Sequence, residues 1–446
     1  MNDGYDFQNG SFFLFSIKQD NTEFFRNYLE NDVRWRQENS IFITNYILRY
    51  ASNLTNPDDK RLIKYSLAEP EKYPLYLFEN SGKNSLYNRD RPASGNNPKL
   101  EGVNIYTFDS GVSFLEFHIL YGKMDAEEIE EFIYKFRSLR FNETDKRIKY
   151  PDNKYSAEKM IEKILDPEIA KIELCFENPS NVKRQAYVYT ALNVKEFCND
   201  IPDEKLIRKW CYYISKGFPK FFDYSENETV NEKYAMNLVC NGNTYWNGCQ
   251  DGLVCLVTNI NMYQYNRIIN DYYYVYLLLL NQRFSMISYI EEISVAGDGI
   301  NVNENGKQMN KRLEKLERLR NNIVSINTRY SFRVVSDDYY VQTVYSKMYD
   351  TLTIDDLMKD VEESYDQLNN IISLNRRKSE RLTESLLTAL SILAIFSSLV
   401  DLTGYLDRFV SPENMRGAQW ISLAVNLLIL AGGIIWIFTR QNRKRK

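Results

Sequence analysis

The chain has 446 residues, enough for two or three folded units, and a formal net charge of −4. This charge argues against a general nucleic-acid binder, which carries a broad basic excess, so no direct nucleic-acid partner is expected. The single histidine, His118, lies in an expected strand, whereas catalytic triads and histidine metal sites need a histidine with a partner. Since the chain also has no P-loop, no dinucleotide-binding glycine motif and no paired-cysteine finger, we do not expect an enzyme.

Residues 1–260 are expected to form an α/β domain in two parts, 1–150 and 151–260. Asp109-Ser110-Gly111 is expected to join two strands as a β-hairpin. The segment NGNTYWNGCQDG, residues 241–252, reads as a turn because of its Asn and Gly content. The expected helices are 21–38, 39–51, 126–140, 156–165 and 195–216, and the expected strands are 103–108, 112–121, 169–176, 185–192, 234–240 and 253–258.

Residues 261–306 are read as a long helix followed by a linker. The apolar core of the helix, Tyr272–Leu280, is nine residues long and so too short to span a bilayer, which predicts a buried helix. The linker, Gly297–Gly306, is identified by its glycine and asparagine content. The 34 tyrosines of the chain suit sheets, interfaces and aromatic ligand contacts alike, and they do not choose between these roles.

The segment from Lys307 to Thr403 contains neither glycine nor proline, the two residues that most reliably interrupt helices. It therefore predicts one or two very long helices, with stalk helices over 307–381. Ser336-Asp337-Asp338 is expected to mark a kink or a helix restart, and Thr353 with Asp356 fits a capping box. Near-heptad spacing predicts a homo-oligomeric bundle, and the residues that recur at this spacing are Leu357, Val361, Tyr365, Leu368, Ile372 and Asn375.

Two uncharged segments near the C-terminus predict membrane helices. Gly417–Thr439 has the length that a spanning helix needs, and Ser385–Val400 reaches it with its flanking residues. Cations before the first segment and after the second predict cytoplasmic N- and C-termini. The alternative is a buried helical hairpin. The expected boundaries are transmembrane helix 1 over 382–405, an external loop over 406–416, transmembrane helix 2 over 417–439 and a basic tail over 440–446.

Polar residues of the first membrane segment fall on one helix face. In an oligomer this face would line a pore, with acidic rings at the outer mouth from Asp401 and Asp407. Alternatively, the serine and threonine residues simply allow close helix packing in the membrane. The expected pore-lining residues are Glu384, Thr388, Ser391, Ile395, Ser398 and Leu402.

The stretch Asn375–Asn414 resembles the stalk end, pore helix and loop of the CorA family of divalent-cation channels. The resemblance is specific over roughly the last 110 residues and architectural before them. It implies an α+β cytosolic domain, a long stalk helix and two C-terminal transmembrane helices, assembled as a pentamer in the bacterial inner membrane. The family carries Gly-Met-Asn at the outer mouth, where this chain has Gly404-Tyr405-Leu406. Because leucine cannot hydrogen-bond a hydrated magnesium ion, ordinary magnesium uptake is not the first expectation.

CorA-like proteins without this motif resemble membrane effectors of type III CRISPR antiviral defence, activated by a nucleotide second messenger such as S-adenosylmethionine–AMP. This resemblance implies a channel that is gated by a nucleotide and perturbs the membrane or the ion balance. The tyrosine-rich domain is compatible with such a ligand, because adenine stacks on aromatic rings. Phosphate partners would come from Arg34, Arg36, Lys183 and Arg184, each of which is equally an ordinary surface cation.

Two other readings remain open. The first is a housekeeping Mg²⁺ or divalent-cation transporter regulated by cytosolic metal, with Asp355, Asp356 and Asp360 as the candidate metal ligands. The second is a membrane-anchored scaffold with no pore. The ligand, the transported ion and the subunit number do not follow from the sequence.

Overall fold

A computed structural model of the chain describes residues 8–38, 41–56, 59–73, 75, 98–137, 157–174, 185–196, 198, 200–217, 235–259, 261–297 and 306–409. The chain divides into two compact units. Unit 1 comprises Met1–Ala296 and Glu317–Tyr365, and unit 2 comprises Gly297–Leu316 and Asp366–Lys446.

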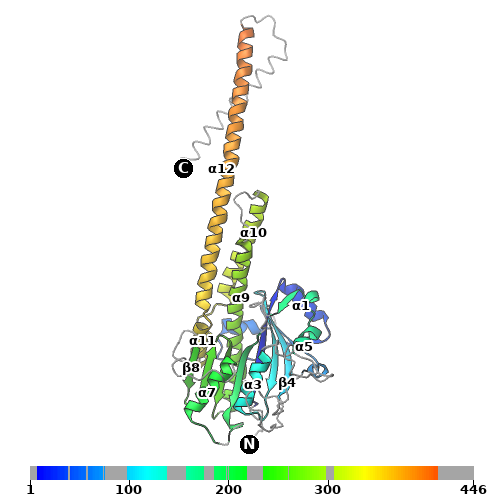
Figure 1. The fold of residues 1–446 in the computed structure, drawn as a ribbon, viewed down its shortest axis with the longest axis vertical. Coiled ribbons are helices and arrows are strands. Elements are labelled where there is room, and N and C mark those ends of the chain that lie inside the picture. The colour runs from blue at the N-terminus through cyan, green and yellow to red at the C-terminus, as the bar shows by residue number, and fades with distance from the viewer. Residues whose placement is uncertain are drawn as a thin grey trace. The chain divides into compact units, whose positions relative to one another are not determined.

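Unit 1 is built on one ten-stranded mixed sheet (Figure 1). The strand order is β2-β3-β4-β5-β1-β7-β10-β9-β8, and the short β6 pairs with β1 beyond the end of β7. All neighbouring strands are antiparallel except β7 and β10, which are parallel. The strands are β1 (Gly10–Gln19), β2 (Trp35–Gln37), β3 (Leu62–Leu67), β4 (Lys99–Phe108), β5 (Val112–Leu120), β6 (Ile172–Leu174), β7 (Tyr187–Asn193), β8 (Ala235–Cys240), β9 (Thr244–Cys249) and β10 (Gly252–Val257).

The central strand β1 is apolar on both faces because helices cover both sides of the sheet. Successive side chains of a strand point to opposite faces. Phe13 meets Phe136 of α3 on one face, with ring centroids 4.7 Å apart, and Phe12 stacks on Tyr273 of α9 on the other, at 4.4 Å. Almost the whole strand is consequently buried.

The first face of the sheet is covered by amphipathic helices, with α3 and α7 visible over it in Figure 1. Side-chain caps start two of them: Asn21 accepts from the Phe24 amide before α1, and Asp203 accepts from the Leu206 amide before α7. Gly217 ends α7 at φ +55°, a conformation that favours glycine. Among the described residues, the helices that precede α8 are α1 (Thr22–Asn31), α2 (Arg49–Ser52), α3 (Ala126–Arg137), α5 (Ala157–Ile164), α6 (Pro167–Ala170) and α7 (Glu204–Lys216).

The second face is covered by α9 (Tyr273–Gly297), which follows α8 (Met262–Arg267) and a π-helical turn, Ile268–Tyr272. Residues 271–286 of this segment are buried, which confirms the prediction of a buried helix. Phe284 packs edge-on against Phe114 of β5 at 5.7 Å, which fixes the helix against the sheet centre.

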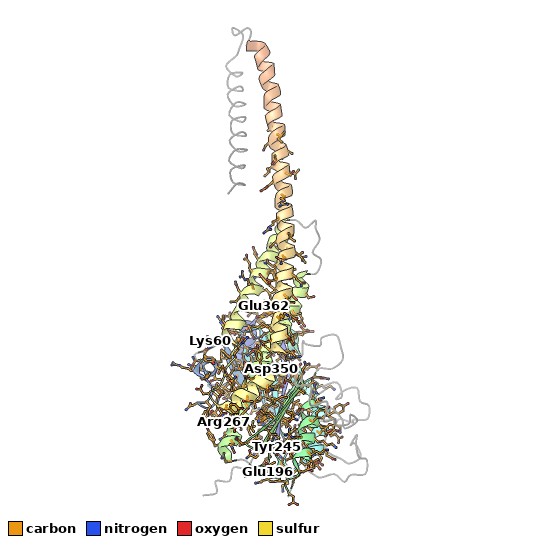
Figure 2. The ribbon with its side chains drawn as sticks, turned by 90° about the vertical axis from the view of Figure 1, so that its left-hand side faces the viewer. Lys60, Glu196, Tyr245, Arg267, Asp350 and Glu362 are labelled. Atoms are coloured by element: carbon orange, nitrogen blue, oxygen red, sulfur yellow. The ribbon has the colours of Figure 1, made fainter. Side chains whose placement is uncertain are left out.

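The glycine- and proline-free region forms three helices rather than one or two: α10 (Gly306–Arg329), α11 (Tyr339–Thr351) and α12 (Ile354–Phe409). The predicted restart is confirmed, because the Asp338 carboxylate caps α11 by accepting from the Tyr340 and Val341 amides. The exposed side chains of Asp350 on α11 and Glu362 on α12 are drawn in Figure 2. Thr353, at the predicted capping box, has φ +54° and directly precedes α12.

The described residues correct the predicted two-transmembrane, CorA-like fold class. Among them, no helix is both long and apolar enough to cross a membrane. Ser385–Val400 lies within α12, and its uncharged run between Glu384 and Asp401 extends only about 24 Å, less than the roughly 30 Å of a hydrocarbon core. The finding also corrects the expected membrane-protein and ion-channel character and the expected bacterial inner-membrane location. The second expected span, Gly417–Thr439, lies outside the described residues.

Three further element predictions are wrong. The expected helix over 21–38 stops at Asn31, and β2 follows it because Trp35–Gln37 pairs with β3. The expected helix over 39–51 is reduced to α2 among the described residues. The expected turn over 241–252 contains β9, which lies between β8 and β10.

Candidate functional site

The candidate site is a surface groove beside α1, with a volume of about 570 Å³. Helix α1 buries one face, which carries Phe25, Arg26 and Leu29. The opposite side of the helix carries Phe24, Asn27, Tyr28 and Asn31, which are three or four residues apart and therefore form one stripe. The groove, called the α1 groove below, is lined by Phe24, Asn27, Tyr28, Asn31, Asp32, Val33 and Arg34.

At the C-terminal end of α1, the floor of the groove is the ion pair between Asp32 and Arg34. The Asp32 carboxylate accepts from Arg34 Nε at 2.9 Å and from Arg34 Nη2 at 2.5 Å. Burial alone would raise the pKa of Asp32, but the hydrogen bonds from Arg34 hold it below its ordinary value. Arg34 Nη1 donates to the Lys163 carbonyl at 2.6 Å, so each nitrogen of the guanidinium already has an acceptor. Arg34 therefore shapes the groove more than it attracts anions.

The chain from α5 to α6 approaches the stripe from the other side. The Asp166 amide donates to the Tyr28 hydroxyl at 3.2 Å, and the same aspartate caps α6. Lys171, which ends α6 at φ +52°, places its Nζ 4.7 Å from the centroid of the Phe24 ring. A cation over an aromatic ring is attracted to the ring face. Lys171 is therefore a cation that lies against Phe24, one of the residues that line the groove.

This arrangement suits a planar, polar ligand that carries negative charge. The Phe24 and Tyr28 rings offer stacking surfaces, and Phe24 is 38 % exposed. Asn27 and Asn31 each supply one amide donor group and one acceptor. Lys171 supplies a positive charge, and the volume lies in the range of small-molecule sites.

The phosphate partners considered from the sequence are dispersed. Arg34 lines the α1 groove, whereas Arg36 is an exposed residue of the edge strand β2. Lys183 and Arg184 lie outside the described residues. The stripe of Phe24, Asn27, Tyr28 and Asn31 was missed, although aromatic and amide residues alternating at helical spacing were a usable signal.

The expected pore-lining residues all lie in α12. Thr388 Oγ1 donates to the Glu384 carbonyl and Ser391 Oγ to the Leu387 carbonyl, each at 2.7 Å, so both hydroxyls are bonded within their own helix. The side chains of Ile395, Ser398 and Leu402 lie outside the described ones. The residues expected at an outer mouth are helical, because α12 continues to Phe409: they are Asp401, Gly404, Tyr405, Leu406 and Asp407.

The expected metal-binding carboxylates Asp355, Asp356 and Asp360 are exposed in the first two turns of α12. Asp355 accepts from the Tyr349 hydroxyl at 2.6 Å. Across the described residues, no group of three histidine, cysteine, aspartate or glutamate side chains is placed to hold a metal ion. His118 stacks on Phe12 with ring centroids 4.2 Å apart, and burial lowers its pKa.

Comparison with known proteins adds no relative. No family model matches the chain, and neither a curated protein nor a solved structure is significantly similar to it. The proposed function is therefore based on the geometry of the α1 groove.

Proposed function

We propose that unit 1 is a non-enzymatic sensing domain that binds an adenine nucleotide in the α1 groove. The observation that carries the proposal is the single stripe of two aromatic rings and two carboxamides, one ring of which, Phe24, lies 4.7 Å from the ammonium of Lys171. Stacking on aromatic rings is worth about 1–3 kcal/mol per base, and carboxamides hydrogen-bond base edges in both directions. The proposed binding of the nucleotide uses only these four side chains and Lys171.

Each part of the nucleotide has a counterpart in this site. The adenine stacks on Phe24 and Tyr28, and Asn27 or Asn31 bonds its edge. The phosphate lies toward Lys171, because Arg34 is already held by Asp32 and the Lys163 carbonyl. The closed Arg34–Asp32 pair therefore favours a ligand with few phosphates, such as a monophosphate or a dinucleotide. S-Adenosylmethionine–AMP, the ligand class implied by the sequence resemblance, fits this description.

Isothermal titration of the full chain with AMP, ATP and S-adenosylmethionine–AMP tests the proposal. We expect saturable binding that Phe24→Ala weakens roughly 5- to 150-fold, the equivalent of one lost stacking contact. Leu206→Ala is the matched control, because Leu206 is an equally exposed apolar residue of α7 that does not line the groove. Absence of binding by all three nucleotides, or equal affinities of the two variants, would overturn the assignment.

A second readout addresses the sensing role. After overnight incubation with the chain, the bound nucleotide should be recovered unchanged by mass spectrometry. Conversion of the nucleotide at a rate that Phe24→Ala abolishes would instead make the α1 groove an active site.

A further inference from the structure

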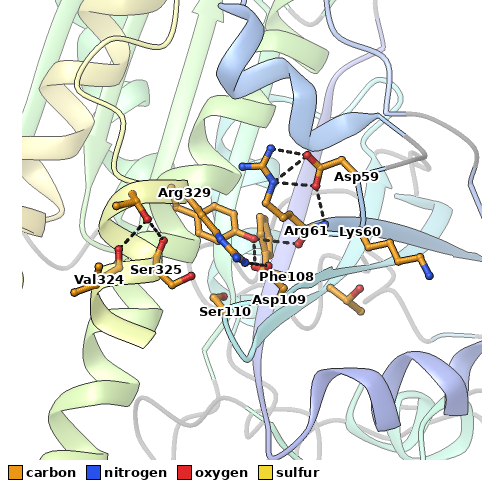
Figure 3. A network of polar contacts seen from close by, with 12 residues as sticks. Asp59, Lys60, Arg61, Phe108, Asp109, Ser110, Val324, Ser325 and Arg329 are labelled. Atoms are coloured by element: carbon orange, nitrogen blue, oxygen red, sulfur yellow. Dashed lines mark hydrogen bonds and ion pairs between the residues drawn. The ribbon is translucent and has the colours of Figure 1, made fainter. Parts of the chain in front are cut away.

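A continuous set of polar contacts connects the buried side of α1 to the end of α10. This set, the Arg26–Tyr330 relay, comprises Arg26, Lys60, Arg61, Thr107, Asp109, Arg329 and Tyr330. Figure 3 shows the part of it around Arg61, Asp109 and Arg329. All of these residues belong to unit 1. Arg26 is 9 % exposed and lies on the helix that lines the α1 groove, between Phe24 and Asn27. A change of position of α1 therefore moves a buried guanidinium.

Arg26 holds α1 to two neighbouring segments. Its Nε donates to Thr107 Oγ1 and its Nη2 to the Thr107 carbonyl, each at 2.9 Å. Its Nη1 donates to the Lys60 carbonyl at 2.6 Å, and Nη2 also reaches the Arg61 carbonyl at 3.4 Å. The last contact is the longest of the four and is the one that a small shift of α1 breaks first.

The Arg61 carbonyl is shared by more donors than it can satisfy. It also lies 3.0 Å from the Asp109 amide nitrogen and 3.1 Å from the Tyr330 hydroxyl. A carbonyl oxygen has two lone pairs, so three donors compete for it. The Tyr330 hydroxyl has one proton and a second acceptor, the Asp109 carboxylate, to which it makes a short bond.

The Tyr330 hydroxyl consequently has two acceptors within reach, the Arg61 carbonyl and the Asp109 carboxylate. Tyr330 is 1 % exposed, and burial followed by the Asp109 charge raises its pKa, so the hydroxyl stays protonated and donates one bond. The charged Asp109 carboxylate is the stronger acceptor of the two while Arg26 and the Asp109 amide also donate to the Arg61 carbonyl. When Arg26 withdraws, a lone pair of the carbonyl becomes free and competes for the same proton.

Asp109 connects the Tyr330 hydroxyl to α10, because its carboxylate bonds both Tyr330 and Arg329. Its Oδ2 accepts from Arg329 Nη1 at 2.8 Å, and Arg329 is the last residue of α10. The Arg329 side chain is 52 % exposed, so the ion pair contributes little by itself and is easily rearranged. Tyr330 also contacts this turn directly, because its amide donates to the Ile326 carbonyl at 2.9 Å, so a change in the Tyr330–Asp109 bond acts on the residue that closes α10.

We propose that occupancy of the α1 groove is transmitted to the last turn of α10 through the Arg26–Tyr330 relay, with the Arg61 carbonyl as the shared acceptor. This regulatory inference rests on the proposed function for its ligand. The mechanism is independent of the ligand, since Arg26 and Tyr330 both contact the Arg61 carbonyl in the structure.

The ligand-free test is a double-mutant cycle on the full chain. Arg26→Lys removes the planar fork but keeps the charge, and Tyr330→Phe removes only the hydroxyl. Each should raise the hydrogen-exchange rates of the amides of Ser325–Arg329 at least threefold. If the two residues are coupled, the double variant exchanges no faster than the faster single variant. Multiplicative rate increases, or no increase in either variant, would overturn the relay even if nucleotide binds.

The ligand-bound test uses AMP and S-adenosylmethionine–AMP as probes. Either nucleotide should change the exchange of Ser325–Arg329 at least threefold in the natural chain, and Tyr330→Phe should abolish that change. Tyr189→Phe is the matched control, because Tyr189 is a similarly buried tyrosine whose hydroxyl donates to the Ile268 carbonyl, outside the relay. An undiminished response in Tyr330→Phe overturns the relay. Absence of any nucleotide binding overturns the proposed function alone, and the ligand-free cycle then decides the relay.

Discussion

Tyr273 and Tyr276 lie one turn apart on the buried helix α9, yet their hydroxyl groups meet different surroundings. The Tyr273 hydroxyl donates to the buried carboxylate of Glu116, which also accepts from Asn104 Nδ2 at 2.5 Å. The Tyr276 hydroxyl is fully buried and, within the described residues, has no hydrogen-bond partner. An unpaired buried polar group costs free energy, whereas a bond to a charged group stabilises.

The same substitution should therefore have opposite effects at these two positions. Tyr276→Phe is expected to raise the free energy of unfolding by about 1 kcal/mol, because it removes a desolvated hydroxyl. Tyr273→Phe is expected to lower it by about 2 kcal/mol, because Glu116 loses a donor. Urea unfolding of both variants checks the pair. A destabilised Tyr276→Phe would mean that the hydroxyl has a partner.

His118 gives unit 1 a defined pH dependence. Burial lowers its pKa from the ordinary 6.5, so the unfolded chain binds a proton that the folded chain does not. The contribution of His118 to stability is therefore complete above pH 6.5 and is lost as the pH falls below that value. His118→Phe, which keeps a ring against Phe12, should remove this part of the loss.

The measurement is urea unfolding at pH 7.5 and pH 5.5 for both proteins. The natural chain should lose more unfolding free energy between the two pH values than His118→Phe does. Equal losses would show that other groups account for the change. Because His118 is the only histidine, its imidazole signal in an NMR titration reports the folded pKa directly.

On helix α12, the residues of the predicted heptad seam are not the apolar residues that are exposed. Three residues of the seam, Val361, Leu368 and Ile372, are already buried within a single chain. Apolar side chains that remain exposed on the same helix are Ile371, Leu374, Leu386, Leu387, Leu390 and Ile392. An exposed apolar helix face is a surface for association. The homo-oligomer expected from the sequence is therefore proposed to form through these residues.

Replacement of this surface tests the association. We expect Leu386→Glu with Leu390→Glu to reduce the molar mass measured by light scattering to that of one 52.8 kDa chain. Glu363→Gln, an exposed position of α12 outside the apolar surface, should leave the oligomer intact. A natural chain that is monomeric at micromolar concentration would contradict the proposal.

Nucleotide binding is expected to stabilise unit 1, the unit that contains the α1 groove. A ligand present at one hundred times its dissociation constant stabilises the state that binds it by about 2.7 kcal/mol. Nucleotide should therefore slow the hydrogen exchange of the unit 1 strands β1 and β5, which unfold with the groove. The strands are the sensitive reporters because their amides open only in global unfolding of the sheet. Equal exchange with and without saturating nucleotide would argue against binding to folded unit 1.

The features that follow from the sequence are local ones. Asp109-Ser110-Gly111 placed the hairpin of β4 and β5 because Gly111, at φ +88°, supplies the turn conformation within three residues. Asp338 placed the start of α11 because a capping carboxylate accepts from the amides two and three residues further on, here those of Tyr340 and Val341. The apolar run Tyr272–Leu280 predicted a buried helix because no polar face interrupts it.

The features that only the tertiary structure decided depend on partners distant in the chain. Strand pairing made β9 from a segment with turn composition, and it ended the first helix early to form β2. Tyr28, which lines the α1 groove, accepts a hydrogen bond from the Asp166 amide, more than 130 residues later in the chain. Within the described residues, the expected first span was wrong because the short uncharged run Ser385–Val400 lies inside the much longer helix α12, with charged residues directly on both sides of it. Local patterns fix caps and turns, whereas packing between distant segments fixes the sheet order and the site.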